Sequence, residues 1–329
     1  TYGFPKIVEA LKLFGKGSET ADVLQAITGK SVAQLDGDFR KYLDIRLKAY
    51  AGTFKLPTRG FDDVTKLEIA ADAAPKDGKA RAQVALAYYY AGDAEKAMSA
   101  STTALSLDAK QPIARYIQAE IVLHQGDLAK AKSMYQSLIV DGHDSFDMRS
   151  RLAQIAEGEN NAAETEAQLC AAKKLDPERS FPYQELVQLY EKAGQMPKAL
   201  VELEHYAFLE QMDLAPLKKL VTEYGKLGSW AKVRTYGEMA TYINPSDAEI
   251  LGGLARAYLE LRQPDRALFT YDTMLLVNPP PRRPALVHLG RTKALIAQGK
   301  KADARAALAQ AMRTEPENAE ALQLKATLK

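Results

Sequence analysis

Four histidines are the residues of this chain best suited to hold a catalytic metal ion: His124, His143, His205 and His288. A common zinc site uses two histidines one helical turn apart, with a glutamate between them that polarises the zinc-bound water. That His-Glu-x-x-His motif is absent, because the two closest histidines, His124 and His143, are 19 residues apart. The reversed order fails as well, since Val201 stands where VELEHY would need its first histidine. Solvated or helix-capping histidines are expected, unless the fold gathers scattered ones around a zinc ion.

The other candidates for chemistry are one cysteine and a pair of glycines. Cys170 lies in AQLCAAKKL beside Leu169 and Ala172, a setting more typical of a small packing residue than of a nucleophile. Neither a phosphate-binding P-loop nor a strand-borne Gly-x-Gly-x-x-Gly occurs. The glycines of LGGLAR (251–256) allow two helices to approach closely, or Gly252 leaves room for a ligand. The sequence therefore predicts no catalytic residue, no metal and no cofactor.

The composition is that of a globular protein without a strong charge bias. The chain has 329 residues, 47% of them hydrophobic, with 44 lysines and arginines against 42 aspartates and glutamates. This balance argues against a bulk electrostatic surface for nucleic acid, although a local basic patch stays possible. The single cysteine excludes an internal disulfide, and no apolar run is long enough to span a bilayer. We therefore expect no nucleic-acid partner and no membrane span.

A 34-residue period organises most of the chain. The segments AQVALAYYYAGDAEKAM (82–98), LVQLYEKAGQMPKAL (186–200) and ARAYLELRQPDRAL (255–268) share a small residue, an aromatic residue three positions later, a turn and then an alanine. With Gly92 at position 15 of a 34-residue unit, six units follow one another without a slip, and a seventh starts three residues late, after NPPPRRP. The units span 78–111, 112–145, 146–179, 180–213, 214–247, 248–281 and 285–318.

This pattern resembles the tetratricopeptide repeat (TPR). Position 15 is glycine in five units, and Asn160 and Arg262 replace it in the other two. Tyrosine at position 11 and alanine at position 20 recur in most units. Two antiparallel helices are expected in each unit, because small residues allow close crossing and glycine permits the chain to reverse. The resemblance implies an all-α fold, an α-α superhelix of stacked TPR units, preceded here by a small helical N-terminal segment.

The segments that flank the units complete the predicted domain organisation. Residues 51–60 are interpreted as a linker, 61–77 as a degenerate half TPR and 319–329 as a capping helix. The fourth unit lacks a terminal proline in HYAFLEQMDLAP (205–216), so its second helix is expected to extend. NPPPRRP (278–284) is expected to form a bulge, either as an ordinary loop insertion or as a recognition loop.

The TPR resemblance also implies that the first helices of the units line a concave groove. The groove would start aromatic, turn polar and end basic, so that tyrosines pack on apolar side chains of a peptide and cations engage its carboxylates. The alternative is that these residues are solvated helix faces, with tyrosine edges partly buried between units. The candidate partner-binding residues are Leu86, Tyr89, Tyr90, Tyr116, Glu120, His124, Gln154, Gln188, Lys218, Arg256 and Lys293.

Residues 1–50 fall outside the 34-residue phase and predict three helices. These are the opening YGFPKIVEALKLFGKG, TADVLQAIT (20–28), and a helix that begins with a capping box at Ser31 and Gln34. The order resembles the closing helices of peptidase MA-like (gluzincin) domains, which are zinc peptidases often fused to TPRs. Besides the opening and the Gly-rich turn, the match rests on Ile27-Thr28-Gly29-Lys30-Ser31 and on Asp36, Phe39, Tyr42 and Leu43. The resemblance implies that residues 1–50 end a domain whose catalytic part lies upstream.

Two functions are consistent with this organisation. The first is a non-catalytic protein–protein interaction scaffold that binds a peptide or partner protein in the concave TPR groove. The alternative is a C-terminal region that positions substrate for, or tethers, a zinc metallopeptidase whose His-Glu-x-x-His site lies upstream of this chain. Because peptidase MA-like TPR proteins are often exported bacterial proteins, the resemblance favours the periplasm or cell envelope over the cytoplasm.

Overall fold

The chain is almost entirely helical in the computed structural model, which describes residues 2–48, 52–58, 61 and 63–328. The ends of several predicted segments, at Thr1, Tyr50, Ala51, Gly60 and Lys329, lie outside the described residues. The helices begin with α1 (Phe4–Phe14), α2 (Thr20–Thr28), α3 (Val32–Leu47) and α4 (Val64–Ala73). The paired helices are α5 (Gly78–Tyr90), α6 (Ala94–Leu107), α7 (Pro112–His124), α8 (Leu128–Val140), α9 (Phe146–Gly158), α10 (Ala162–Leu175), α11 (Phe181–Lys192), α12 (Met196–Leu209), α13 (Leu214–Lys226), α14 (Trp230–Ile243), α15 (Ala248–Glu260), α16 (Pro264–Met274), α17 (Pro284–Ala297) and α18 (Lys301–Thr314). The last helix is α19 (Ala319–Thr327).

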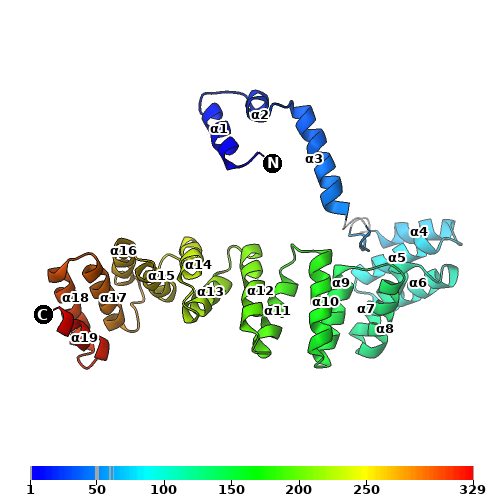
Figure 1. Ribbon diagram of the computed structural model, residues 1–329. Helices are drawn as coiled ribbons and strands as arrows, with labels where there is room; N and C mark the ends of the chain where they lie inside the picture. Colours follow the sequence, from blue (N-terminus) through cyan, green and yellow to red (C-terminus); the bar gives the residue numbers. More distant parts are fainter. Residues whose placement is uncertain (1, 49–51, 59–60, 62, 329) are drawn as a thin grey trace. The chain divides into compact units, whose positions relative to one another are not determined.

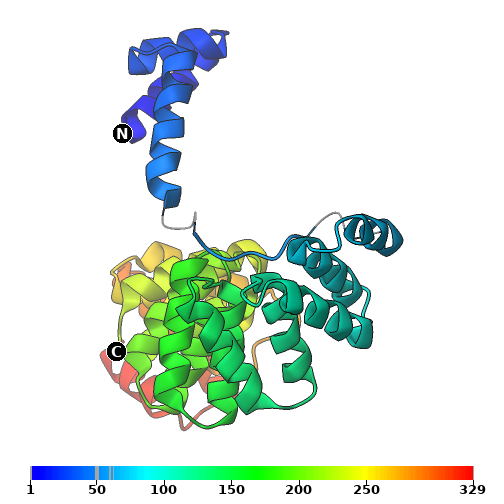
Figure 2. The ribbon, with the colours of Figure 1, turned by 90° about the vertical axis from the view of Figure 1, so that its right-hand side faces the viewer.

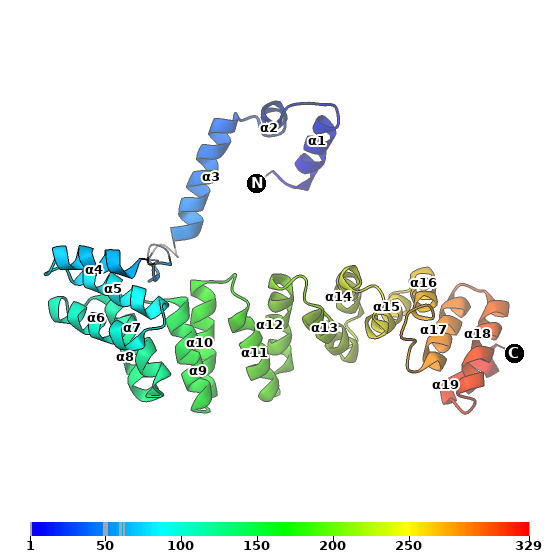
Figure 3. The ribbon, with the colours of Figure 1, turned by 180° about the vertical axis from the view of Figure 1, so that it is seen from behind.

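Helices α5 to α18 form stacked antiparallel pairs, which confirms the predicted all-α solenoid (Figure 1, Figure 3). The chain divides into two compact units, Thr1–Met148 and Arg149–Lys329. The core of the first unit is built around Leu86, Ile117 and Tyr135, and all three side chains are fully buried. In the second unit, Leu186, Leu220, Ile250 and Leu289 are among the fully buried side chains. Each unit thus buries its own apolar helix faces.

The turn inside each pair places one residue in the left-handed backbone region. Glycine occupies this position at Gly92, Gly126 and three later turns, with φ between 67° and 87°. The two residues that break the glycine pattern, Asn160 and Arg262, adopt the same conformation with φ 56°. The backbone geometry is therefore kept where the glycine is not.

Most predicted helix ends are observed. The long second helix that was predicted for the fourth 34-residue repeat (180–213) is not. Asp93 and Asp127 accept hydrogen bonds from backbone N–H groups in the first turns of α6 and α8, as predicted for N-caps. Helix α12 was expected to extend beyond its counterparts, and this prediction is wrong, because it ends at Leu209. The turn is closed by the N–H of Asp213, which donates to the carbonyl of Glu210, while the Asp213 carboxylate caps α13.

Helices α1–α3 differ from the repeats in how little they bury. They lie where the three N-terminal helices were predicted, and the capping box of Ser31 and Gln34 is formed. Among residues 2–48, Val23 is the single buried side chain. Their apolar residues, such as Phe4, Leu11 and Phe39, are largely exposed. No helix in the described residues is long and apolar enough to cross a lipid bilayer.

Candidate functional site

The predicted groove residues differ widely in exposure. The exposed ones are Tyr90, His124, Gln154, Gln188, Arg256 and Lys293, and the half-buried ones are Tyr89 and Lys218. The buried ones are Leu86, Tyr116 and Glu120, with exposed fractions of 0%, 5% and 0%. A partner cannot reach these three side chains in this state, so the expectation that they line an open surface is corrected. They belong to the interior of the first unit.

Glu120 holds together a hydrogen-bond network of three helices. Its carboxylate accepts a hydrogen bond from the hydroxyl of Tyr135 on α8 at 2.5 Å and from that of Tyr89 on α5 at 3.1 Å. A buried carboxylate needs such partners, because an unpaired one would lose its solvation without compensation. Burial, with Glu120 and Asp147 nearby, raises the pKa of Tyr116. The network fixes the aromatic rings of the first unit in place.

The chain's own residues Thr53–Thr58, here called the strap, cover this aromatic region. Figure 2 shows the helix-free chain between α3 and α4. At one end, the N–H of Phe54 donates to the carbonyl of Asp144 at 2.8 Å. At the other, the Tyr90 hydroxyl donates to the carbonyl of Pro57 at 3.0 Å. The predicted linker thus occupies the aromatic end of the predicted groove.

The side chains of the strap pack on the first helices of two repeats. The ring of Phe54 lies 5.9 Å from that of Tyr116 and 5.8 Å from that of His143, measured between centroids. Leu56 packs against the apolar cluster that contains Leu86. Phe61, beyond the strap, joins the same cluster and lies 5.7 Å from the ring of Tyr90.

Two of the three predicted groove cations are paired with carboxylates of the chain. Lys218 contacts Asp247 at 3.1 Å and Glu249 at 2.9 Å, and hydrogen bonds with these carboxylates raise its pKa. Lys293 forms an ion pair with Glu320 of α19. The predicted basic end of the groove is therefore close to charge-balanced.

Arg256 is the most available of the three cations. Its guanidinium lies 4.7 Å from the ring centroid of Trp230, and its nearest carboxylate, Glu260, is 4.0 Å away. Its side chain keeps 64% of its surface exposed. Stacking on an aromatic ring holds a guanidinium in one orientation while its N–H groups stay free for a carboxylate.

An open groove of about 1390 Å³ surrounds Arg256 in the second unit. It is lined by α15, α16 and α17, by the Pro-rich loop 278–283 and by Glu320. Apolar wall residues such as Leu286 and Met274 alternate with charged ones. The loop is tied down by Arg283, whose guanidinium donates to both carboxylate oxygens of Glu315, at 2.8 Å and 3.0 Å. The extra residues of NPPPRRP therefore form one wall of this groove.

Three glycines line the groove, and two of them permit close packing of a neighbouring side chain. A Cβ on Gly253 would lie 2.6 Å from Val221, so this glycine permits α15 to approach α13. A Cβ on Gly252 would meet only the end of Met274, at 3.5 Å, and this residue lines the groove. The ring of Tyr271 packs directly against Gly290, and a Cβ at this position would lie 2.2 Å from the ring. Gly253 thus fits the alternative of close helix approach, while a ligand beside Gly252 stays a prediction.

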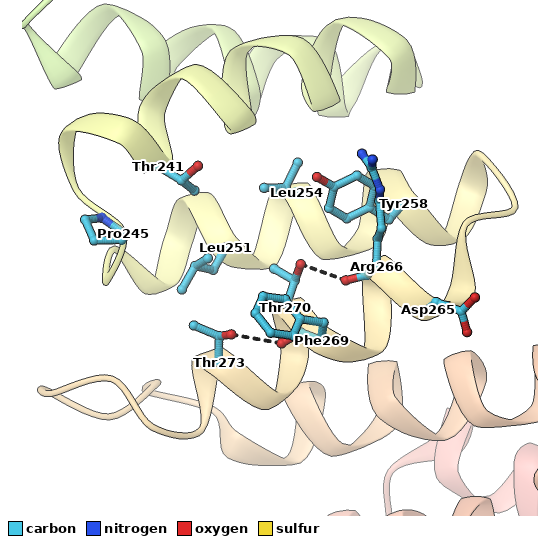
Figure 4. A pocket seen from close by; sticks show the side chains of 10 residues that line it. All are labelled: Thr241, Pro245, Leu251, Leu254, Tyr258, Asp265, Arg266, Phe269, Thr270 and Thr273. Carbon is cyan, nitrogen blue, oxygen red and sulfur yellow. Dashed lines mark hydrogen bonds between the residues drawn. The ribbon is translucent and has the colours of Figure 1, made fainter.

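A second, smaller cavity of about 650 Å³ lies at α14, α15 and α16 (Figure 4). Its wall is mainly apolar, with Leu251 and Leu254 opposite Phe269. The hydroxyls of Thr270 and Thr273 donate to backbone carbonyls of their own helix, at 2.8 Å and 2.9 Å. This cavity offers apolar contact and few free polar groups.

The four histidines and the cysteine have different surroundings. His124 is exposed, His143 contacts Phe54, and His205 stacks on Tyr183. Burial and the charge of Arg291 lower the pKa of His288. Burial also raises the pKa of the Cys170 thiol, which packs in an apolar cluster. No group of three or more metal-ligating side chains occurs within the described residues.

Sequence reasoning missed the strap and the aromatic support of Arg256. The alternation in Phe54-Lys55-Leu56, within a segment interpreted as a linker, was the available signal for the strap. Trp230, the single tryptophan of the chain, was the signal for the aromatic support of Arg256. The contact between Trp230 and Arg256 could not be read from the period, because it joins the second helix of one repeat to the first helix of the next.

Residues 82–142 and 289–328, one segment in each compact unit, match the sequence model of the tetratricopeptide repeat family. The match does not include residues 1–50, and nothing in these comparisons supports a gluzincin-like segment there. No curated protein matches the chain by sequence.

Several solved structures are similar to the chain. YrrB, described as a TPR protein with an unusual peptide-binding site, is 14% identical, with a TM-score of 0.40, over 72% of this chain and all of YrrB. PilF of Pseudomonas aeruginosa is 15% identical, with a TM-score of 0.37, over 77% of this chain and 98% of PilF. A tetratricopeptide repeat protein of Parabacteroides merdae is 14% identical, with a TM-score of 0.40, over 76% of this chain and 97% of its own.

Proposed function

We propose that this chain, which carries tetratricopeptide repeats, is a protein-interaction scaffold that binds a partner segment in the groove at α15–α17. The observation that carries the proposal is the open groove of about 1390 Å³ around Arg256. Solenoid repeats leave the faces of their first helices free, and proteins of this kind use such faces for binding. The aromatic region of the first unit is covered by the strap, so the open part of the predicted groove lies in the second unit.

The groove offers a partner both a charged contact and an apolar contact. Arginine, tryptophan and tyrosine are enriched among the residues that dominate binding energy. Here Arg256 is oriented by Trp230, and the buried ring of Tyr271 packs against Gly290 in the groove wall. Leu286 adds an exposed apolar surface next to them. We propose that a partner places a carboxylate on Arg256 and an apolar side chain against Leu286.

Substitution of two groove residues tests this proposal. Gly252→Leu should fill the groove without straining the helix, because a Cβ there meets only Met274 at 3.5 Å. Arg256→Glu should repel a partner carboxylate. We expect each variant to weaken binding of a partner, or of a peptide selected from a random displayed library, by at least about tenfold, as measured by titration.

A matched control separates the groove from general charge effects. Lys301→Glu makes the same kind of charge change at the exposed start of α18, outside the groove. It should bind like the unsubstituted protein. If all three variants bind equally well while circular dichroism shows them folded, the groove is not the contact surface.

The peptidase-related alternative stays a prediction, as does the location in the cell envelope. Neither has a supporting observation among the described residues. The presence of His-Glu-x-x-His in the gene upstream of Thr1 would revive the alternative, and its absence there would end it.

A further inference from the structure

We infer that the strap is a ligand of the α5–α7 face held in cis, and that this face also accepts a segment of another protein with the same pattern. The pattern is an aromatic residue, a leucine two positions later and a proline directly after it, as in Phe54-Lys55-Leu56-Pro57. This site is separate from the groove at α15–α17, so either proposal can fail without the other.

The strap has the side-chain alternation of a bound linear segment. Thr53, Phe54 and Leu56 are half-buried, whereas Lys55, Pro57 and Thr58 are exposed. From Phe54 to Pro57, every second side chain thus faces the protein, which is the period of a chain lying flat on a surface. Its backbone is held at each end, by the carbonyl of Asp144 and by the hydroxyl of Tyr90.

The surface under the strap is organised by residues outside the strap. Glu120 links Tyr89 to Tyr135, and the ring of Tyr116 lies 6.1 Å from that of Tyr135. These residues come from α5, α7 and α8, so their contacts remain when the strap leaves. A surface that is already ordered binds a short segment at a lower entropic cost than one that must form around it.

The strap is also held more loosely than the core beneath it. Phe54 and Leu56 each keep part of their surface in solvent, while Leu86 and Ile117 under them are fully buried. A tethered segment competes with free ones at an effective concentration on the order of millimolar. An external segment therefore binds when the strap is weakened. It also binds when its own concentration is comparable to the effective concentration of the strap.

Weakening the strap should open the site to a peptide in trans. The variant is Phe54→Ala with Leu56→Ala, and the probe is the labelled peptide TFKLPT, followed by fluorescence anisotropy. The matched control, Lys55→Ala with Thr58→Ala, changes two exposed positions of the same segment. We expect the apparent Kd for TFKLPT to be at least about tenfold lower for the weakened variant than for the unsubstituted protein or the control.

The peptide TAKAPT separates recognition of the two apolar side chains from non-specific binding. It should not bind any of the three proteins. Equal affinity of the weakened and unsubstituted proteins for TFKLPT, or equal affinity for TFKLPT and TAKAPT, would overturn the inference and leave the strap as a structural element only.

A second measurement uses the unsubstituted protein and does not depend on how well the variant folds. TFKLPT added at about millimolar concentration should speed amide hydrogen exchange in residues 53–58 by displacing them, and TAKAPT should not. Unchanged exchange with saturating TFKLPT would contradict displacement in cis.

Discussion

At the scale of single residues, the turns of the repeats show how a backbone requirement survives without its usual residue. Arg262 adopts φ 56° although it has a side chain, and Asn160 does the same. An L-residue in the left-handed region costs about 1–2 kcal/mol, and asparagine tolerates that region better than arginine does. The packing of the two helices that each turn connects compensates for this cost.

Replacing Arg262 with glycine should therefore stabilise the second unit. The gain in the free energy of unfolding is expected to be about 0.5–1 kcal/mol, since glycine removes the strain but adds flexibility to the unfolded chain. Asn160→Gly should give a smaller gain. Urea unfolding followed by circular dichroism measures both, and a loss of stability in Arg262→Gly would show that its side chain contributes more than the strain costs.

At the scale of helices, a recurrent junction joins α4, α10, α12 and α14 to the first helix that follows each of them. The hydroxyl of a tyrosine on the first helix donates to a glutamate on the preceding second helix, and a lysine or arginine lies over the tyrosine ring. The hydrogen-bonded pairs are Tyr88–Glu68, Tyr190–Glu166, Tyr224–Glu204 and Tyr258–Glu238, at 2.5, 2.7, 2.6 and 2.8 Å. The cations are Lys96, Lys198, Lys232 and Arg266, at 5.1, 4.9, 5.8 and 5.7 Å from the ring centroids.

The hydrogen bond in this junction explains why tyrosine recurs at position 11 of the repeats. The space that its ring fills explains this less well. Phenylalanine would fill the same space, but it would leave the glutamate without its neutral donor. Because Glu68 lies on α4, this helix contacts α5 in the way that second helices contact the next repeat.

The junction at Tyr190 should make stability depend on pH. The hydrogen bond from Tyr190 is the largest influence on Glu166 and, with Lys198, holds the pKa of its carboxyl below the ordinary value, against the effect of burial. A carboxyl whose pKa is lowered in the folded state stabilises the fold at pH values above its pKa in the unfolded state. This contribution is lost as the pH falls through its pKa in the folded state. We expect Tyr190→Phe to cost about 1 kcal/mol at pH 7 and clearly less near pH 3.

Tyr242→Phe is the matched control, since Tyr242 is 89% exposed. It should change the free energy of unfolding at neither pH. A Tyr190→Phe penalty that stays the same from pH 7 to pH 3 would argue that the tyrosine acts through packing alone.

At the scale of the whole molecule, burial divides the chain into regions of different stability. In α1–α3, Val23 is the single buried side chain of the described residues, whereas each repeat buries several. The last pair is covered by α19 and by Leu328, which directly follows it. Ala321 and Leu328 are buried against α17 and α18, and the carbonyl of Leu328 accepts a hydrogen bond from Arg305. Solenoids need such a cover at an end, because a terminal repeat otherwise exposes its apolar face.

Hydrogen exchange should follow this division. Amides of α1–α3 are expected to exchange at least about tenfold faster than those of α5–α18, because few buried contacts oppose local opening. Mass spectrometry of peptic fragments measures both regions in one experiment. Equal protection would mean that α1–α3 are stabilised by contacts beyond those described.

The sequence by itself determined the helices, their pairing and the repeats, because each of these depends on residues close together in the chain. The 34-residue period, the aspartate caps and the glycine turns act within one repeat, so spacing alone reveals them. The resemblance to TPRs then implied which positions of the first helices face the groove, but it did not give their accessibility.

Only the tertiary structure decided which of those positions are open. Glu120 is buried because Tyr89 and Tyr135, from two other helices, donate to it. The aromatic region is covered because Phe54 reaches Asp144, 90 positions away in the sequence. Charge pairing and burial depend on neighbours in space, and residues so distant in sequence become neighbours only when the helices stack.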